Sequence, residues 1–231
     1  MKIAKQSVDL IDSMGSDLSV VNAARVSFAK ESEWEVIPGK ERFEKNSYTL
    51  SEKDQKLISY LAKHNHWTPF AHAFLSFRIK APIFVARQLV KHQVGLAWNE
   101  VSRRYVDDEP EFFFPETWRG KPVNAKQGSN GEVDLSGGKI KGMYWPKDCT
   151  VHSLIGYKQL LKAGVAPEQA RMVLPQNTMT EWIWSGSLAA FARVVRLRMD
   201  PHAQLETQEI ASKINDSIPD SFQWSWKALT Q

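Results

Sequence analysis

The chain of 231 residues contains a single cysteine, Cys149. One cysteine excludes an intrachain disulfide and any zinc site built from several cysteines, and it is typical of proteins in a reducing compartment. The sequence also lacks any apolar run near the roughly 18 residues of a membrane span, and its first residues lack the apolar segment of a secretory signal. These absences predict a cytoplasmic protein without a membrane partner.

Neither sign of charge dominates, since 30 Lys and Arg stand against 26 Asp and Glu, for a formal net charge of +4. So small an excess favours anionic partners without naming one, and phosphorylated small molecules and nucleic acids both qualify. The 9 tryptophans and 11 phenylalanines could stack on rings or bases, although core packing is the commoner role of an aromatic side chain.

No internal repeat divides the chain, and its length suits one domain over residues 1–231. The sharpest change in composition spans residues 119–142, where six glycines and few large apolar side chains predict a loop. A loop of this length is either a functional flap or a disordered insertion, and the sequence does not decide between them.

Periodicity predicts both strands and helices. Apolar and polar residues alternate over residues 72–79, with Ala73 and Ile79 among the apolar ones, as in a half-buried strand. Pro82 then suits the first position of a helix. That helix would carry four polar side chains on one face, Arg87, Gln88, Lys91 and His92. Further helices are predicted over residues 150–163, 188–199 and 203–214, and another is predicted to begin at Pro167. Helices and strands in separate blocks indicate an α+β fold.

The densest group of polar residues lies between residues 91 and 105. It consists of Lys91-His92-Gln93, Asn99-Glu100 and Ser102-Arg103-Arg104-Tyr105. An oriented polar ligand requires such a mixture of cations, amides, a carboxylate and a hydroxyl. For this stretch taken alone, a solvated helix end with ordinary charges is the plainer interpretation.

Together with the residues that precede it, this stretch resembles the signature of the flavin-dependent thymidylate synthases. That signature is Arg-His-Arg followed by Asn-Glu-x-Ser-x-Arg-Tyr. Four more blocks are similar to segments of that family, in the family's order. They are Ala23-Ala24-Arg25-Val26-Ser27, His66-Trp67-Thr68-Pro69-Phe70, the block from Gly164 through Pro167-Glu168 and Arg171 to Pro175, and the block from Leu197-Arg198 through His202-Ala203-Gln204 to Glu206. Ordered blocks over most of residues 20–215 are far more specific than one short motif.

The resemblance implies a single α+β domain with a mainly antiparallel sheet packed against helices. It implies a homotetramer with active sites built between subunits. The implied reaction is the reductive methylation of dUMP to dTMP, with methylenetetrahydrofolate as one-carbon donor, FAD as redox cofactor and NADPH as reductant. In such a reaction the protein mainly binds, orients and stabilises charge, because the cofactor carries the redox chemistry.

The resemblance also assigns site residues. Those expected to bind dUMP are Gln88, Lys91, Glu100, Ser102, Arg103, Arg104, Arg171 and Arg198. Those expected to bind FAD are Thr68, Lys91, His92, Gln93, Asn99, Glu100 and His202. Arg198 is the expected catalytic residue, because a fixed cation near N3 and O2 of the uracil pushes electron density to C5 and contributes on the order of 3 kcal/mol. A plainer role for Arg198 is to bind the last carbonyl groups of its helix.

The sequence departs from the family pattern within this signature. Lys91 and Gln93 stand where most members have arginine, and lysine cannot form a bidentate fork. Ala71 stands where an acid often follows Thr-Pro-Phe. We therefore hypothesise that Arg193 or Arg196 replaces part of the missing positive charge.

Two other functions fit parts of the sequence. A thymidylate synthase that uses a cysteine nucleophile would need Cys149, and only His152 is near it as a base. A nucleic-acid-binding module would use the basic excess and the aromatic residues. His64, His66 and His72 suggest a metal site, but no carboxylate or thiolate lies in register with them, and no metal is expected.

Overall fold

A four-stranded antiparallel sheet forms the centre of the computed structural model, which describes residues 1–39, 47–122, 128–135 and 145–231. Across the sheet the strands are β2 (Ser7–Met14), β5 (Phe74–Pro82), β10 (Met179–Ser187) and β6 (Leu96–Glu100). β10 pairs with the whole of β5, from Met179 opposite Pro82 to Ser187 opposite Phe74. The predicted α+β fold with a mainly antiparallel sheet is confirmed.

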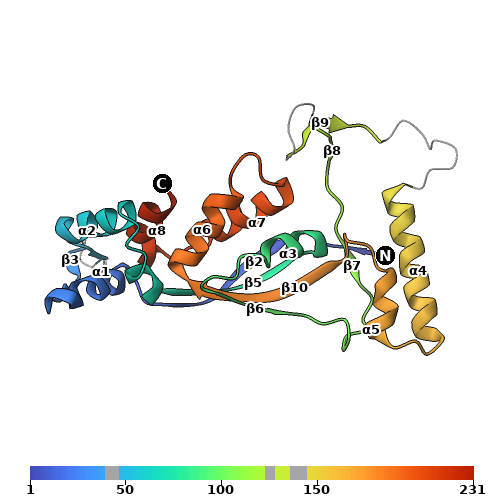
Figure 1. Ribbon diagram of the computed structural model, residues 1–231, viewed down its shortest axis with the longest axis horizontal. Coiled ribbons are helices and arrows are strands. Elements are labelled where there is room, and N and C mark those ends of the chain that lie inside the picture. Colours follow the sequence, from blue (N-terminus) through green and yellow to red (C-terminus); the bar gives the residue numbers. More distant parts are fainter. Residues whose placement is uncertain (40–46, 123–127, 136–144) are drawn as a thin grey trace.

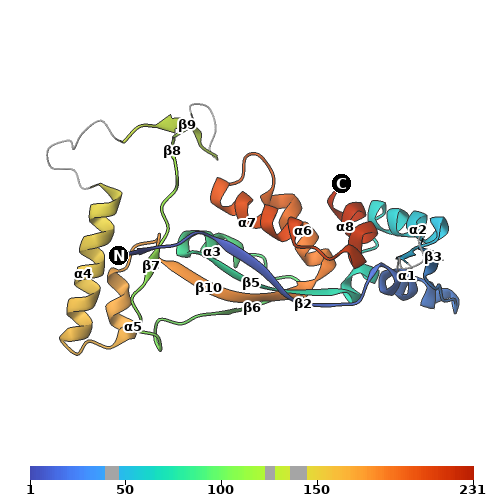
Figure 2. The ribbon, with the colours of Figure 1, turned by 180° about the vertical axis from the view of Figure 1, so that it is seen from behind.

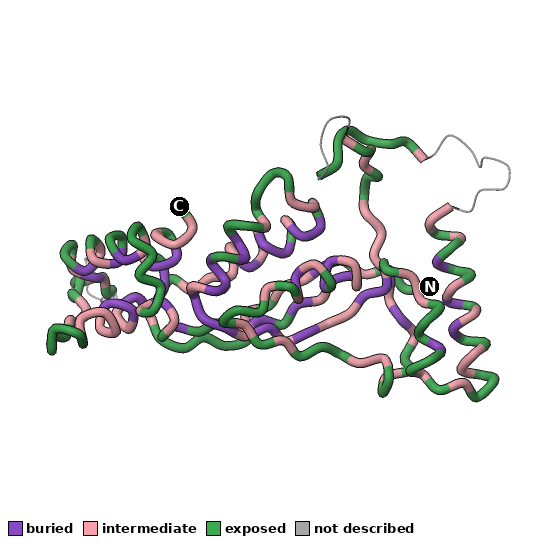
Figure 3. The backbone as a smooth tube through the Cα atoms, viewed as in Figure 1, coloured by how far each residue is buried: buried purple, intermediate pink, exposed green. Residues whose placement is uncertain are grey.

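Helices cover one face of this sheet, as Figure 1 and the reverse view in Figure 2 both show. They are α3 (Ile83–Leu89), α6 (Leu188–Arg198) and α7 (Leu205–Asp216). Leu75, Phe77 and Ile79 of β5 are fully buried on the covered face, as the two-residue period of a strand requires. Phe74 and Arg78 alternate with them and are exposed on the open face. Figure 3 shows buried residues in the sheet, in its covering helices and in the helices at both ends of the sheet.

The helix predicted over residues 188–199 is α6. Ser187 caps its N-terminus, since its hydroxyl accepts a hydrogen bond from the Ala190 N–H at 3.2 Å. Phe191, Val194 and Val195 face the core, as their spacing predicts, and are almost fully buried. Each such side chain stabilises the fold by about 1.5–3 kcal/mol. α6 is therefore rigidly fixed on the sheet, and with it the arginine in its last turn.

At one end of the sheet, α1 (Asp17–Arg25), α2 (Glu52–Lys63) and α8 (Gln223–Thr230) pack together (Figure 1). The carboxylate of Asp17 accepts hydrogen bonds from the N–H groups of Trp224 and Ser225, at 2.9 and 2.8 Å, and so caps α8 from another helix. The carboxylate of Asp54 pairs with Arg25 and ties α2 to α1.

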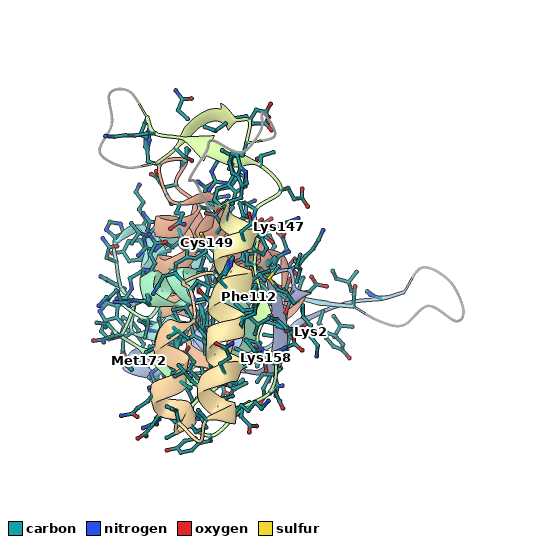
Figure 4. The ribbon with its side chains drawn as sticks, turned by 90° about the vertical axis from the view of Figure 1, so that its right-hand side faces the viewer. Lys2, Phe112, Lys147, Cys149, Lys158 and Met172 are labelled. Carbon is teal, nitrogen blue, oxygen red and sulfur yellow. The ribbon has the colours of Figure 1, made fainter. Side chains whose placement is uncertain are left out.

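At the other end stand α4 (Pro146–Lys162) and the short α5 (Pro167–Ala170). Figure 4 views this end, with Cys149 and Lys158 along α4. A second, smaller core lies here, where Tyr157 of α4 packs with Phe112.

Short strand pairs and 3-10 turns complete the fold. The pairs are β1 (Lys2–Ile3) with β7 (Glu111–Phe112), β3 (Glu35–Ile37) with β4 (Ser47–Thr49), and β8 (Trp118–Gly120) with β9 (Asn130–Val133). The 3-10 turns are η1 (Val26–Phe28), η2 (Pro69–His72), η3 (Arg171–Val173) and η4 (Asp220–Phe222). Within the described residues, no helix has the length and apolar character needed to cross a membrane.

The prediction of a helix that begins at Pro82 is wrong in its extent. Pro82 is the last residue of β5, with φ −69° and ψ 153°, because it still pairs with Met179 before the helix begins at Ile83. The helix ends at Leu89, so only Arg87 and Gln88 of the expected polar face are helical. Lys91 and His92 lie in the turn that follows, closed by a hydrogen bond from the His92 N–H to the Leu89 carbonyl at 3.0 Å.

The predicted loop over residues 119–142 is also partly wrong. Its described residues include Arg119 and Gly120 of β8 and the whole of β9, which form a hairpin. The expectation of a loop for residues 123–127 and 136–142 falls outside the described residues. The strand predicted over 72–79 runs from Phe74, since His72 belongs to η2, and the helices predicted over 150–163 and 203–214 are α4 and α7 with shifted ends.

Candidate active site

Two side-chain hydrogen bonds tie the end of α3 to α6 and α7. Nε of Arg198, in the last turn of α6, donates to Nε2 of His92 at 2.9 Å. On α7, the hydroxyl of Thr207 donates a short hydrogen bond to Oε1 of Gln88. The structure thereby brings together two of the predicted site residues, His92 and Arg198, which lie 106 positions apart in the chain, and it holds a third, Gln88, against α7.

His92 and Arg198 share a partly buried environment. Burial lowers the pKa of His92 below its ordinary value, and the charges of Arg198 and Arg193 lower it further. The imidazole is therefore neutral near pH 7, so its Nε2 carries the lone pair that accepts from Arg198. Burial also lowers the pKa of Arg198, but a guanidinium stays charged in proteins. A half-buried cation of this kind can stabilise negative charge that develops on a ligand.

Three other predicted residues lie close to His92 or Arg198 in the sequence and are exposed. Lys91 and Gln93 flank His92 in the turn after α3. His202 lies in the turn between α6 and α7, where its N–H donates to the Asp200 carboxylate at 2.8 Å. The β8–β9 hairpin comes close to this turn, because a Cβ placed on Gly128 would lie 3.7 Å from the His202 carbonyl oxygen.

A row of aromatic rings connects His92 with Glu100 along β10 and β6. The ring centroid of His92 lies 6.5 Å from that of Trp184, which meets Trp98 edge-on at 5.4 Å. Trp98 stacks on Trp182 at 4.2 Å and donates from Nε1 to the carboxylate of Glu100 at 3.2 Å. The Thr180 hydroxyl donates to the same carboxylate at 2.7 Å. Glu100 is thus held in one orientation at the edge of the sheet.

Glu100, Arg103 and Arg171 line one cavity of about 700 Å³. Arg103 donates to the Asp108 carbonyl at 2.9 Å, and Arg171 donates from Nε to the Glu168 carbonyl at 3.2 Å. Nearby in the chain, the hydroxyl of Ser102 accepts from Nε of Arg104 at 3.0 Å. The described lining of this cavity also includes two lysines and four further acidic residues, namely Lys2, Lys80, Asp108, Glu109, Glu111 and Glu181. Its two guanidinium groups offer the bidentate forks that bind a phosphate, among these opposing carboxylates.

A second cavity, of about 710 Å³, lies between α2, α6 and α8. Its cations are Lys63, Arg193 and Arg196, and no Asp or Glu side chain is among the described residues that line it. Arg193 is fixed by donating to the Val94 carbonyl at 2.6 Å. Trp67, 63% exposed, adds an aromatic surface to the wall. Cations with an aromatic ring, and with no Asp or Glu side chain among the described lining residues, fit a dinucleotide such as FAD, which carries phosphates and planar rings.

Sequence reasoning did not identify Lys63 or Trp67 as residues of a binding cavity. Lys63 is simply the last residue of α2, and only the packing of α2 against α8 brings it to this cavity. Trp67 did carry a signal, since it directly precedes Thr68 within a block that resembles the family. A tryptophan directly beside a predicted cofactor residue is such a signal, because its ring can stack on a planar ligand.

One chain does not gather all predicted residues at one point. Glu100, Arg103 and Arg171 line a different cavity from the one beside Thr68. Asn99 pairs with Ile183 in the sheet, is exposed, and lies on the face opposite Glu100. The site residues of this chain are therefore spread over both ends of β6 and both faces of the sheet.

Cys149 lies apart from these residues. It lines a third cavity, of about 460 Å³, together with Phe84, Phe113 and Trp118, and none of the residues predicted to bind dUMP or FAD is among its described lining residues. Within the described part of the chain, no group of three His, Cys, Asp or Glu side chains is arranged to hold a metal ion.

Solved structures that share this fold include two of one enzyme. The structure of the UMP/dUMP methylase PolB from Streptomyces cacaoi bound with 5-Br dUMP superposes with a TM-score of 0.80 at 27% sequence identity, covering 100% of this chain and 97% of PolB. The PolB structure bound with 5-Br UMP superposes with a TM-score of 0.76 at 25% identity. The fold is therefore similar to that of a UMP/dUMP methylase.

Sequence comparison makes the class more specific. The family model described as thymidylate synthase complementing protein matches residues 9–221. The flavin-dependent thymidylate synthase of Thermosipho africanus is 37% identical over 220 residues, which cover 95% of this chain and 89% of that protein. The enzyme of Thermus thermophilus is 34% identical over 227 residues, covering 98% of this chain and 76% of that protein. The chain belongs to the flavin-dependent thymidylate synthase family.

Proposed function

We propose that this protein methylates dUMP to dTMP, with methylenetetrahydrofolate as one-carbon donor, FAD as redox cofactor and NADPH as reductant. The observation that carries the proposal is the hydrogen bond between neutral His92 and half-buried Arg198, at 2.9 Å. A guanidinium fixed in this way can stabilise negative charge on the uracil ring and so raise electron density at C5. Bound FAD supplies the redox chemistry of the reaction.

The cation-lined cavity supports the flavin assignment. Lys63, Arg193 and Arg196 offer positive charge for the diphosphate of FAD, and Trp67 offers a surface for a planar ring. None of the seven residues proposed to contact FAD is among the described residues that line this cavity, although Thr68 follows Trp67 directly and Gln93 precedes the Val94-Gly95 wall. The proposed FAD residues are Thr68, Lys91, His92, Gln93, Asn99, Glu100 and His202.

The dUMP residues in this proposal orient the nucleotide by charge and by hydrogen bonds. They are Gln88, Lys91, Glu100, Ser102, Arg103, Arg104, Arg171 and Arg198. Arg103 and Arg171 are suited to the phosphate, because a guanidinium binds phosphate oxygens in a bidentate fork. In this scheme the hydroxyl of Ser102 donates a hydrogen bond to the phosphate, and Ser102 is not a nucleophile.

We further propose that the active sites form between subunits of a homotetramer. Two observations support this arrangement. The site residues are divided between two cavities of one chain. The open face of the sheet also carries exposed apolar side chains, with Met14 58% and Phe74 42% exposed, and such a surface is suited to protein contact. With no more than one cysteine, the enzyme is suited to the cytoplasm.

The test is dTMP formation by the purified protein with all four small molecules present, and with each one omitted. Arg198→Lys keeps the charge but removes the fork and the bond to His92, so kcat should fall about 100-fold. Arg87→Lys, on the exposed side of α3, is the matched control and should retain wild-type turnover. Because PolB is named a UMP/dUMP methylase, the assay includes UMP. A wild-type protein that forms no dTMP, or an Arg198→Lys variant with unchanged kcat, contradicts the proposal.

A further inference from the structure

The hydrogen bond from Arg198 to His92 depends on the protonation state of His92. A guanidinium only donates hydrogen bonds, so Nε2 of His92 must carry a lone pair to accept from Nε of Arg198 at 2.9 Å. In a neutral imidazole with Nε2 unprotonated, the proton sits on Nδ1. A second proton, added at Nε2, would place donor against donor and cation against cation, and the contact would be lost.

The surroundings of His92 keep it neutral. The charged groups that act on it from α6 are both cations, Arg198 and Arg193. From β10 it faces the uncharged indole of Trp184, and in its own turn it stands beside Lys91. Burial and the two arginines all lower the pKa of His92, so the neutral ring persists to more acidic pH than that of an ordinary histidine.

The same geometry leaves most of the Arg198 guanidinium available. Its Nε is used by His92, whereas the two terminal nitrogens lie at the far side of the planar group and can bind a ligand in a bidentate fork. α6 fixes the backbone of Arg198, and the imidazole fixes its long side chain, which otherwise loses rotamer freedom on binding. A ligand that meets this guanidinium therefore meets a donor that is already oriented.

We propose that His92 is a positioning residue that orients Arg198 toward the uracil ring through its Nε2, and that protonation of His92 releases Arg198 and weakens nucleotide binding. This inference rests on the proposed function, because it takes dUMP as the ligand of Arg198. It gives His92 a role through another side chain, in addition to the flavin contact proposed for it.

The experiment measures the dissociation constant of dUMP from the FAD-loaded protein between about pH 5 and about pH 8, the range in which histidines titrate. The phosphate of dUMP titrates in the same range, so each variant is compared with the wild type at every pH. His92→Gln offers an acceptor oxygen that does not titrate. It should bind dUMP within about threefold of wild type near pH 8 and lose the weakening that wild type shows at acidic pH. His92→Phe offers no acceptor and should bind about tenfold more weakly near pH 8, the usual effect of losing a hydrogen bond to a charged group.

Two further variants separate positioning from a merely structural role. Arg193→Ala removes one of the charges that lower the pKa of His92, so the pH at which binding weakens should move upward. His72→Gln, an exposed histidine on η2, should keep the wild-type pH dependence. The tautomer can also be read directly, since nitrogen-15 chemical shifts of the wild-type histidines should show one ring protonated at Nδ1 whose signal is absent from His92→Gln.

Each outcome decides the proposal. If His92→Gln retains the acid-dependent weakening of wild type, or His92→Phe binds dUMP as tightly as wild type, His92 does not position Arg198. A wild-type His92 protonated at Nε2 near pH 8 overturns the proposal even where a variant fails to fold. If the wild type binds no dUMP at any pH, the proposed function itself fails, and that result is distinct from binding without pH dependence.

Discussion

Replacing Asp54 by Asn should destabilise the protein strongly, although Asp54 is not among the proposed site residues. The Asp54 carboxylate accepts from Nε of Arg25 at 3.0 Å and from the hydroxyls of Ser51 and Ser32 at 2.8 and 3.1 Å. Its side chain is 4% exposed and that of Arg25 is 14% exposed. Arg25 belongs to the Ala-Ala-Arg block that resembles the family, so this motif arginine has a structural partner.

The magnitude follows from the burial of the pair. Removal of one partner of a buried ion pair costs about 3–5 kcal/mol, because it leaves the other charge uncompensated. Arg25 retains some contact with water, so the lower end, about 3 kcal/mol, is the better figure. For a chain of this size that corresponds to a fall of about 6–12 °C in Tm. The exposed pair of Lys56 and Glu52, with side chains 80% and 86% exposed, is the matched comparison, and Glu52→Gln should change stability by less than about 0.5 kcal/mol.

The pH dependence provides an independent check. Burial alone would raise the pKa of Asp54, but the hydrogen bonds from Arg25, Ser51 and Ser32 and the charge of Arg25 outweigh it and hold the pKa below its ordinary value. The stabilisation is therefore fully present above the ordinary carboxyl pKa and is lost as pH falls through the lowered one. Thermal unfolding at fixed protein concentration, near neutral pH and in acid, measures both effects. An Asp54→Asn protein that unfolds within about 1 °C of wild type at neutral pH would refute the reasoning.

Two further predictions concern the active site. If Arg193 and Arg196 supply charge to the flavin diphosphate, Arg193→Ala and Arg196→Ala should each weaken FAD binding about tenfold in a fluorescence titration, and unchanged affinity in both variants would make this hypothesis wrong. Cys149→Ala should form dTMP at a rate within about twofold of wild type, because its cavity contains none of the proposed site residues among those described; loss of dTMP formation in that variant would favour a cysteine nucleophile instead.

Much of the fold could be predicted where one periodicity continued over a whole element. Phe191, Val194 and Val195 have the spacing of a helix face, and they are buried in α6 as expected. The boundaries near residue 82 could not be predicted in this way. The fixed φ of proline suits the first turn of a helix and an extended strand equally, and only pairing with β10 keeps Pro82 in β5.

The sequence indicates a set of candidate site residues but not how they are arranged in space. The polar face expected at 87–92 assumed a continuous helix, whereas the chain turns after Leu89 and reaches β6 through Gly95 with φ +77°. That turn, and not helical spacing, brings His92 to Arg198, a contact between residues 106 positions apart. Lys63 likewise reaches the cation-lined cavity only through helix packing, which leaves no local signal in the sequence.

An absorption spectrum of the purified protein shows whether the cations and amides around His92 and Arg198 bind dUMP beside a flavin. After incubation with FAD and removal of unbound cofactor, the protein should show visible flavin absorbance that changes on titration with dUMP and saturates. A colourless protein without affinity for dUMP, but with salt-sensitive binding to long polynucleotides, would contradict the account and favour a nucleic-acid-binding role.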